Sequence, residues 1–176
     1  LFKKLRKDQK GFTLVELLVV IAIIGILATL LLLQLGIARQ RARDAARVAH
    51  VNQVRTALEL YFDDNGKYPV SATYGTSNGT GLGPLLYPKY LTQLPLDPLS
   101  STPYFYNYAS DPITTPTKYH IWAELEQSSG ALKGDADINS SAWAEGAGKK
   151  DASVASSELC TSSTNIDCVY DQGHSQ

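Results

Sequence analysis

The sequence is poor in several residue types, and each shortage removes a class of protein. Its 176 residues include no methionine, two cysteines and three histidines. Two cysteines are too few for a small disulfide-stapled scaffold, and without a nearby third ligand they make an incomplete zinc set. The histidines, His50, His120 and His174, are too scattered to predict a metal site. No spacing of serine, histidine, aspartate or cysteine favours a nucleophilic active site, so we do not expect an enzyme.

Proline and charge are distributed unevenly along the chain. All eight prolines lie between Pro69 and Pro116, so none interrupts the sequence before that point. The formal net charge is only −1, but it is unevenly distributed. Residues 1–47 carry nine Lys or Arg and three Asp or Glu, whereas residues 48–176 carry seven Lys or Arg and fourteen Asp or Glu. The chain therefore has a basic, apolar N-terminal third and an acidic, turn-rich remainder.

The longest apolar run covers residues 12–33, interrupted only by Thr13, Glu16, Gly25 and Thr29. As a helix it spans roughly 33 Å, enough to cross a hydrocarbon core of about 30 Å. A helix that is apolar on every side has nothing to pack against in so small a protein. A secretory signal would have a shorter run followed by a small-residue cleavage site. We therefore expect a membrane segment, although the similar positive charge on its two flanks leaves its orientation open.

The helical pattern continues beyond the apolar run. Apolar residues recur at steps of three and four, at Val51, Val54, Leu58 and Tyr61. This stripe predicts that residues 34–64 continue the helix in amphipathic form. Asn65-Gly66 is a typical stop signal, with the glycine as a left-handed cap.

The rest of the chain predicts a small antiparallel sheet among loops. Residues 104–109 are strand-like, and residues 118–126 alternate between apolar and polar side chains, with two proline turns between them. We expect this hairpin to pack on the helix stripe, with residues 65–103 as a loop holding one short helical turn. From Gln127 onward we expect loops, with at most a short turn near Trp143. The predicted fold class is therefore α+β, a long N-terminal helix against a small sheet with a loop-rich C-terminus.

Glu16 is the informative residue of the apolar run. A charge at the centre of a membrane costs roughly 2.5–3.5 kcal/mol, so such a residue is a functional candidate that needs a partner. Lys10 lies nearly on the opposite side of the helix and cannot be the partner of Glu16. The alternative interpretation is that Glu16 simply lies among the lipid headgroups.

Residues 10–21, KGFTLVELLVVI, closely resemble the prepilin signature of the type IV pilin and type II secretion pseudopilin superfamily. The resemblance implies that residues 1–11 are a basic leader removed after Gly11. It also implies that the new N-terminal Phe12 is methylated. In such a protein Glu16 pairs with the α-amine of a neighbouring subunit during assembly, which sets the axial register of the filament.

The resemblance is strong over residues 1–64 and looser beyond. Residues 94–98 and 103–106 resemble the Asp-Pro and Pro-Tyr turn of major pseudopilins, but Leu99-Ser100 stands where Trp-Gly is usual. We therefore expect a pilin-like filament subunit, with a major pseudopilin of a type II secretion system as the alternative. From another class, a non-polymerising single-pass membrane protein with a small binding domain remains open.

The resemblance also implies partners and a location. The partners would be identical or related pilin subunits in a helical homopolymer, the prepilin peptidase, the inner-membrane assembly platform and membrane lipid. The precursor would cross the inner membrane once with a cytoplasmic N-terminus, and residues 65–176 would form an extracytoplasmic head. The filament would stand in the periplasm or at the cell surface. No nucleic acid is expected, because no aromatic residues interleave Arg39, Arg41, Arg43 and Arg47, which we interpret as a solvated or headgroup-facing flank.

Two features of the C-terminal region remain. Asp135, Asp137 and Asn139 alternate like calcium ligands, but the EF-hand pattern fails in the residues that follow them. The resemblance implies that calcium can be held in a C-terminal loop of another design; otherwise this is an acidic surface turn and no cofactor is expected. Because the implied location is outside the cytoplasm, we predict that Cys160 and Cys168 form a disulfide.

Overall fold

The computed structural model describes residues 11–71, 73–75, 79–144, 146, 148–161 and 166–175. The predicted leader therefore lies outside the described residues, except for Gly11. The chain divides into two compact units, residues 1–39 and residues 40–176, and each is described by itself.

Helix α1 covers Leu14–Asn65 and is 52 residues long. It begins two residues later than predicted, because Thr13 caps its first turn. It ends where the sequence predicts. Gly66 adopts a φ of 67°, and its N–H donates to the carbonyl of Phe62 at 2.7 Å. This left-handed C-terminal cap confirms the stop signal at Asn65-Gly66.

The sheet has three antiparallel strands in the order β1-β2-β3, with β1 at Tyr106–Asp111, β2 at Lys118–Glu124 and β3 at Val169–His174. The predicted hairpin of β1 and β2 is confirmed, with Asp111 opposite Lys118 at its turn. Strand β3 was not predicted, so the expectation of loops throughout the C-terminal region is wrong at this point.

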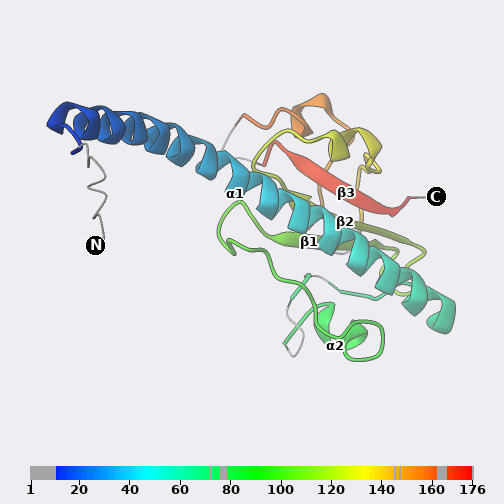
Figure 1. Ribbon diagram of the computed structural model, residues 1–176. Coiled ribbons are helices and arrows are strands. Elements are labelled where there is room, and N and C mark those ends of the chain that lie inside the picture. Colours follow the sequence, from blue (N-terminus) through cyan, green and yellow to red (C-terminus); the bar gives the residue numbers. More distant parts are fainter. Residues whose placement is uncertain are drawn as a thin grey trace, which may run out of the picture. The chain divides into compact units, whose positions relative to one another are not determined.

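The second half of α1 lies across one face of the sheet (Figure 1). The predicted stripe supplies the helix side of the core, where Val51, Val54 and Leu58 are fully buried. Buried side chains from all three strands complete this core, among them Tyr106, Tyr108, Tyr119, Ile121, Ala123 and Tyr170. The short helix α2 (Gly83–Leu86) adds Leu86 to the same core, which confirms the predicted helical turn. The α+β fold class is thus confirmed.

The opposite face of the sheet is also covered. Sequence alternation placed His120, Trp122 and Glu124 on an outward, polar face of β2, but all three are buried. The C-terminal loops cover them: Trp122 packs with Ala152 and donates to the carbonyl of Gly148 at 2.6 Å, and His120 contacts Ser140. These loops also contain two short 3-10 helices, η1 (Gly130–Gly134) and η2 (Ala155–Ser157), and Leu132 of η1 joins the core on the α1 side. This second layer creates a buried polar environment that the sequence pattern did not predict.

Candidate functional site

The first functional feature is the apolar surface of α1 before Gln40. Every large apolar side chain between residues 12 and 32 is 46–83% exposed. By length and composition α1 is able to cross a membrane. A continuous apolar surface of this size marks contact with a membrane or another protein.

The bond between Gly11 and Phe12 lies immediately before this surface. Both residues are exposed and precede the first helical residue, Leu14. A Cβ added to Gly11 would meet no atom of the described residues within 4 Å, so this part of the structure does not require glycine at the position. Any requirement for glycine must therefore come from a molecule that acts on the chain.

Glu16 and Thr13 form a capping box at the start of α1. The backbone N–H of Thr13 donates to Oε2 of Glu16 at 2.8 Å, and the Thr13 hydroxyl donates to the same oxygen at 2.7 Å. In return, the N–H of Glu16 donates to Thr13 Oγ1 at 3.2 Å. These bonds satisfy donors that every helix start leaves open. The Thr-x-x-Glu spacing indicates this cap, which gives Glu16 a local partner besides the cationic one expected from its charge.

A buried ionic cluster joins the head to α1. Arg47 has a fully buried side chain, and its Nε lies 2.6 Å from Oδ2 of Asp97. Its Nη1 lies 2.8 Å from Oδ1 of Asp44 and 2.8 Å from Oε1 of Glu126. Burial opposes the charge of Arg47, but the hydrogen bonds to Asp97 and Glu126 outweigh it and raise the pKa of the guanidinium. Arg47 is therefore charged and held in place by three carboxylates.

The prediction of a solvated arginine flank is therefore wrong for two of the four arginines. Arg47 is buried, and Arg43 makes a bidentate pair with Glu126 at 2.6 Å for both bonds. Arg39 and Arg41 are exposed, as expected. The difference arises because the loop after β2 returns to α1 and supplies Glu126, a tertiary contact between residues far apart in sequence.

The predicted metal residues are only partly brought together. Asp135 and Asp137 lie with Asp171 in a cluster whose carboxylate oxygens are within 4.8 Å of one another. Burial, followed by the charge of Asp171, raises the pKa of Asp135 to about 7. Asn139 does not join them, because its amide contacts Asp151 and its Oδ1 accepts hydrogen bonds from Ser141. The proposed set of Asp135, Asp137 and Asn139 is therefore not what the fold assembles.

The fold does bring a serine, a histidine and an aspartate together, although no sequence spacing suggested it. His120 Nδ1 lies 2.7 Å from Ser140 Oγ, and its Nε2 lies 3.0 Å from Asp171 Oδ2. All three residues are completely buried. Ser140 Oγ also exchanges hydrogen bonds with the backbone of Lys150, both at 3.0 Å. A serine with no access to substrate and a fully bonded hydroxyl is a structural residue and not a nucleophile.

Glu124 binds the loop that the disulfide closes. Its Oε1 accepts the backbone N–H groups of Asp167 and Cys168, both at 2.9 Å. Its Oε2 is buried and has no hydrogen-bond partner among the residues that the structure describes. Burial raises the pKa of Glu124 to about 7. The structure contains the predicted disulfide between Cys160 and Cys168.

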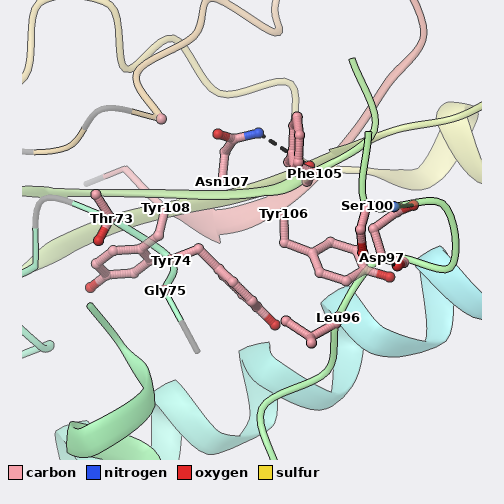
Figure 2. A pocket seen from close by; sticks show the side chains of 11 residues that line it. Thr73, Tyr74, Gly75, Leu96, Asp97, Ser100, Phe105, Tyr106, Asn107 and Tyr108 are labelled. Atoms are coloured by element: carbon pink, nitrogen blue, oxygen red, sulfur yellow. Dashed lines mark hydrogen bonds between the residues drawn. The ribbon is translucent and has the colours of Figure 1, made fainter. Parts of the chain in front are cut away.

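A cavity of about 230 Å³ lies between β1 and two loops (Figure 2). Tyr74, Tyr106 and Tyr108 line it, and their hydroxyls bond to Pro95 O, His50 Nδ1 and Pro69 O respectively. Their hydroxyls are therefore already engaged. Among the described residues that line the cavity, the single carboxylate, that of Asp97, is paired with Arg47. This wall offers apolar contact but no group suited to acid–base or nucleophilic chemistry.

The geometry thus defines a head packed on the second half of a long helix, whose exposed apolar first half begins with a capping box. Comparison with known proteins gives the same result. The model of the prokaryotic N-terminal methylation motif matches residues 6–32. The type IV wide pilus major component PilA4 of Thermus thermophilus is 48% identical over 62 residues, which cover 35% of this chain and 47% of that protein.

A second relative extends the match into the head. The type II secretion system core protein G of Pseudomonas aeruginosa is 34% identical over 147 residues, which cover 76% of this chain and 95% of that protein. The corresponding protein of Dickeya chrysanthemi is 32% identical over 107 residues, covering 53% of this chain and 65% of its own length. No solved structure matches the chain.

The chain belongs to the superfamily of type IV pilins and type II secretion pseudopilins. It is a pilin-like filament subunit, and this superfamily consists of structural subunits and not of enzymes.

Proposed function

We propose that this chain is stored in the inner membrane as a precursor and polymerises into a filament through the apolar half of α1. The observation that carries the proposal is the exposed apolar surface between residues 12 and 32. At about 25 cal/mol per Å² of apolar area, leaving such a surface in water is very unfavourable. The bilayer covers it before assembly, and the helices of neighbouring subunits cover it afterwards.

Cleavage of the leader is the first step of this proposal. The prepilin peptidase cuts after Gly11 and methylates Phe12, at a bond that precedes the helix and is open to solvent. Since no described residue from 11 onward occupies the space beside Gly11, the glycine serves the enzyme and not the fold of the mature chain. Gly11→Val should therefore leave the leader attached without unfolding the protein.

A matched control separates processing from folding. Gly25 also has open space around it, but it lies inside α1 and far from the cleaved bond. Gly25→Val should be processed normally. Intact mass of both variants, purified from membranes that contain the peptidase, decides the matter. Normal cleavage of Gly11→Val, or a mature start after residue 33, would contradict the proposal.

Glu16 then acts in assembly. In the isolated subunit its carboxylate is held by Thr13, so it enters the membrane with hydrogen-bond partners. In the filament the new α-amine on Phe12 of a neighbouring subunit pairs with it. In a low-dielectric core an unpaired charge is costly and a paired one is favourable, so subunits add at the register where the pair forms.

A secretion pseudopilus is the second candidate, and the 147-residue match to a secretion core protein favours it. The match to a wide-pilus component is confined to 62 residues and favours a pilus less strongly. The partners in both cases are identical or related subunits and an inner-membrane assembly platform. Fractionation of the source cells separates the two, since pili are sheared from the cell surface and a pseudopilus remains in the periplasm.

A further inference from the structure

The carboxylate of Asp171 binds the turn that contains Asp135, Asp137 and Asn139. Asp171 projects from β3 and is completely buried. Its Oδ1 accepts the backbone N–H groups of Ala136 and Asp137 at 3.1 and 3.0 Å, and its Oδ2 accepts that of Ile138 at 2.8 Å. Three consecutive amides therefore converge on one side chain, which fixes the backbone of this turn.

His120 supplies the group that faces this carboxylate from the neighbouring strand. Its Nε2 lies 3.0 Å from Asp171 Oδ2, and both side chains are completely buried. On the other side of the ring, Nδ1 meets Ser140 Oγ at 2.7 Å, and Ser140 is bonded to the backbone of Lys150. These contacts therefore connect β3 and β2 to Ser140 and Lys150, which belong to the C-terminal loops that cover this face of the sheet.

This arrangement leaves little room on Asp171 for a metal ion. A carboxylate offers about four lone-pair sites, and three backbone amides occupy three of them. The His120 ring faces the remaining side, with Nε2 at 3.0 Å from Oδ2 and no hydrogen bond of its own among the described residues. Calcium takes six to eight oxygen ligands. Of the other acids in the cluster, Asp135 has already committed Oδ2 to the N–H of Asp171, so only its Oδ1 and the exposed Asp137 remain.

The donor set therefore does not fit calcium, and entry of an ion would have costs. A cation that captured Asp171 would release the N–H groups of residues 136–138, and that of Ile138 is buried. An unsatisfied buried N–H group is strongly unfavourable. We propose that Asp171 is the built-in acceptor of this turn, held by three backbone amides and faced by the imidazole of His120, so that the folded head requires no divalent cation at Asp135, Asp137 and Asp171. The proposal is independent of filament assembly.

The direct test uses the wild-type mature chain, full length in detergent. Its thermal midpoint is measured by circular dichroism in excess EDTA and again in millimolar calcium chloride. We expect the same midpoint in both. If a calcium site were present and the calcium concentration were about 100 times its Kd, calcium would instead raise the midpoint by roughly 5–10 °C for a protein of this size. Such a rise would overturn the proposal.

Two isosteric variants locate the effect. Asp171→Asn should lower the midpoint equally with and without calcium, because the amide NH₂ opposes the donors that the carboxylate accepts. Asp137→Asn, the exposed control in the same cluster, should leave the midpoint unchanged.

Tryptophan fluorescence provides a second measurement of unfolding, since the ring of Trp143 lies 6.3 Å from that of His120. If Asp171→Asn fails to fold, the wild-type calcium titration still decides, and a calcium-dependent rise that Asp137→Asn abolishes would establish a metal site instead.

Discussion

Arg47 on α1 and Asp97 in the loop before β1 are joined by two hydrogen bonds, Nε to Oδ2 at 2.6 Å and Nη2 to Oδ1 at 3.1 Å. Fifty residues separate them in sequence. The same guanidinium contacts Asp44 and Glu126, and its carbon lies 4.5 Å from the centre of the Tyr104 ring. One side chain on α1 therefore binds three side chains of the head, Asp97, Tyr104 and Glu126.

Loss of Arg47 should be among the most damaging single changes in the head. Arg47→Ala leaves three carboxylates without their common partner, and breaking a buried ion pair from one side typically costs about 3–5 kcal/mol. Arg47→Lys should recover only part of this, because an ammonium cannot make the bidentate bond to Asp97. Urea unfolding of the mature chain measures the change. Arg41→Ala, at an exposed position six residues earlier, should cost less than about 0.5 kcal/mol; equal losses at the two positions would contradict the assignment.

Glu124 should make the head less stable as the pH rises toward neutrality. Burial raises its pKa from 4.5 to about 7, so the folded state holds a proton that the unfolded state releases above pH 4.5. The contribution of this group to stability is therefore complete below pH 4.5 and is lost as the pH rises to about 7. The loss amounts to about 3 kcal/mol.

Glu124→Gln tests this dependence. The amide oxygen retains the acceptor for the N–H groups of Asp167 and Cys168 and cannot ionise. The difference in unfolding free energy between the variant and the wild type should therefore shift in favour of the variant between pH 4.5 and 7. Asp135→Asn is the necessary companion, because the pKa of Asp135 is also raised to about 7. Parallel pH profiles for wild type and Glu124→Gln would rule out the buried proton.

The sequence predicted the features that depend on local pattern. The stripe at Val51, Val54 and Leu58 repeats with helical period, and the stop at Asn65-Gly66 depends on the backbone preference of glycine. Both follow from residues close together in the chain, and both are confirmed. The hairpin of β1 and β2 belongs to the same group, because two proline turns mark the reversal between its strands.

The features that were missed depend on contacts between distant segments. Strand β3 contains Asp171, Gln172 and Gly173 and does not alternate as an exposed strand would. It forms because its backbone pairs with β2 and because Asp171 meets His120 in the buried layer. No local period could predict that the polar face of β2 would be covered, since the cover comes from loops with few large apolar residues. The same limit explains why the sequence pattern predicts a solvated flank at Arg43 and Arg47.

Glu16 should have two separable roles, capping and assembly. Glu16→Gln keeps an oxygen that can accept from Thr13 but removes the charge, whereas Glu16→Leu removes both. If assembly depends on the pair with the α-amine of a neighbouring Phe12, both variants should insert into the membrane and neither should polymerise. Quantitative blotting of filament and membrane fractions at equal expression gives the answer.

Thr13→Val provides the matched control for the cap. It removes the hydroxyl partner at a cost of about 1 kcal/mol to the helix start but leaves the charge of Glu16 in place. Its filament yield should fall less than that of Glu16→Gln. A normal yield from Glu16→Gln together with a loss from Thr13→Val would show that capping, and not charge, is the requirement for assembly.

The disulfide between Cys160 and Cys168 should stabilise its loop without being needed for the rest of the head. It closes a loop of about nine residues, for which chain entropy gives roughly 2.6 kcal/mol. Hydrogen bonds also hold both ends of this loop. The N–H of Cys160 donates to Asp167 O at 2.9 Å, and Cys168 O accepts from the N–H of Leu125 at 2.7 Å. Cys160→Ser should therefore speed amide exchange at residues 158–161 while β2 and α1 remain protected.

Hydrogen exchange followed by mass spectrometry resolves this difference, with the wild type under reducing conditions as the second sample. The reduced wild type should behave like Cys160→Ser, because both lose the same covalent link and keep the same hydrogen bonds. Collapse of protection in β2 would mean instead that the loop organises the end of this central strand through Glu124, whose Oε1 accepts the N–H of Cys168. Alkylation of both cysteines in exported protein without reductant would refute the disulfide itself.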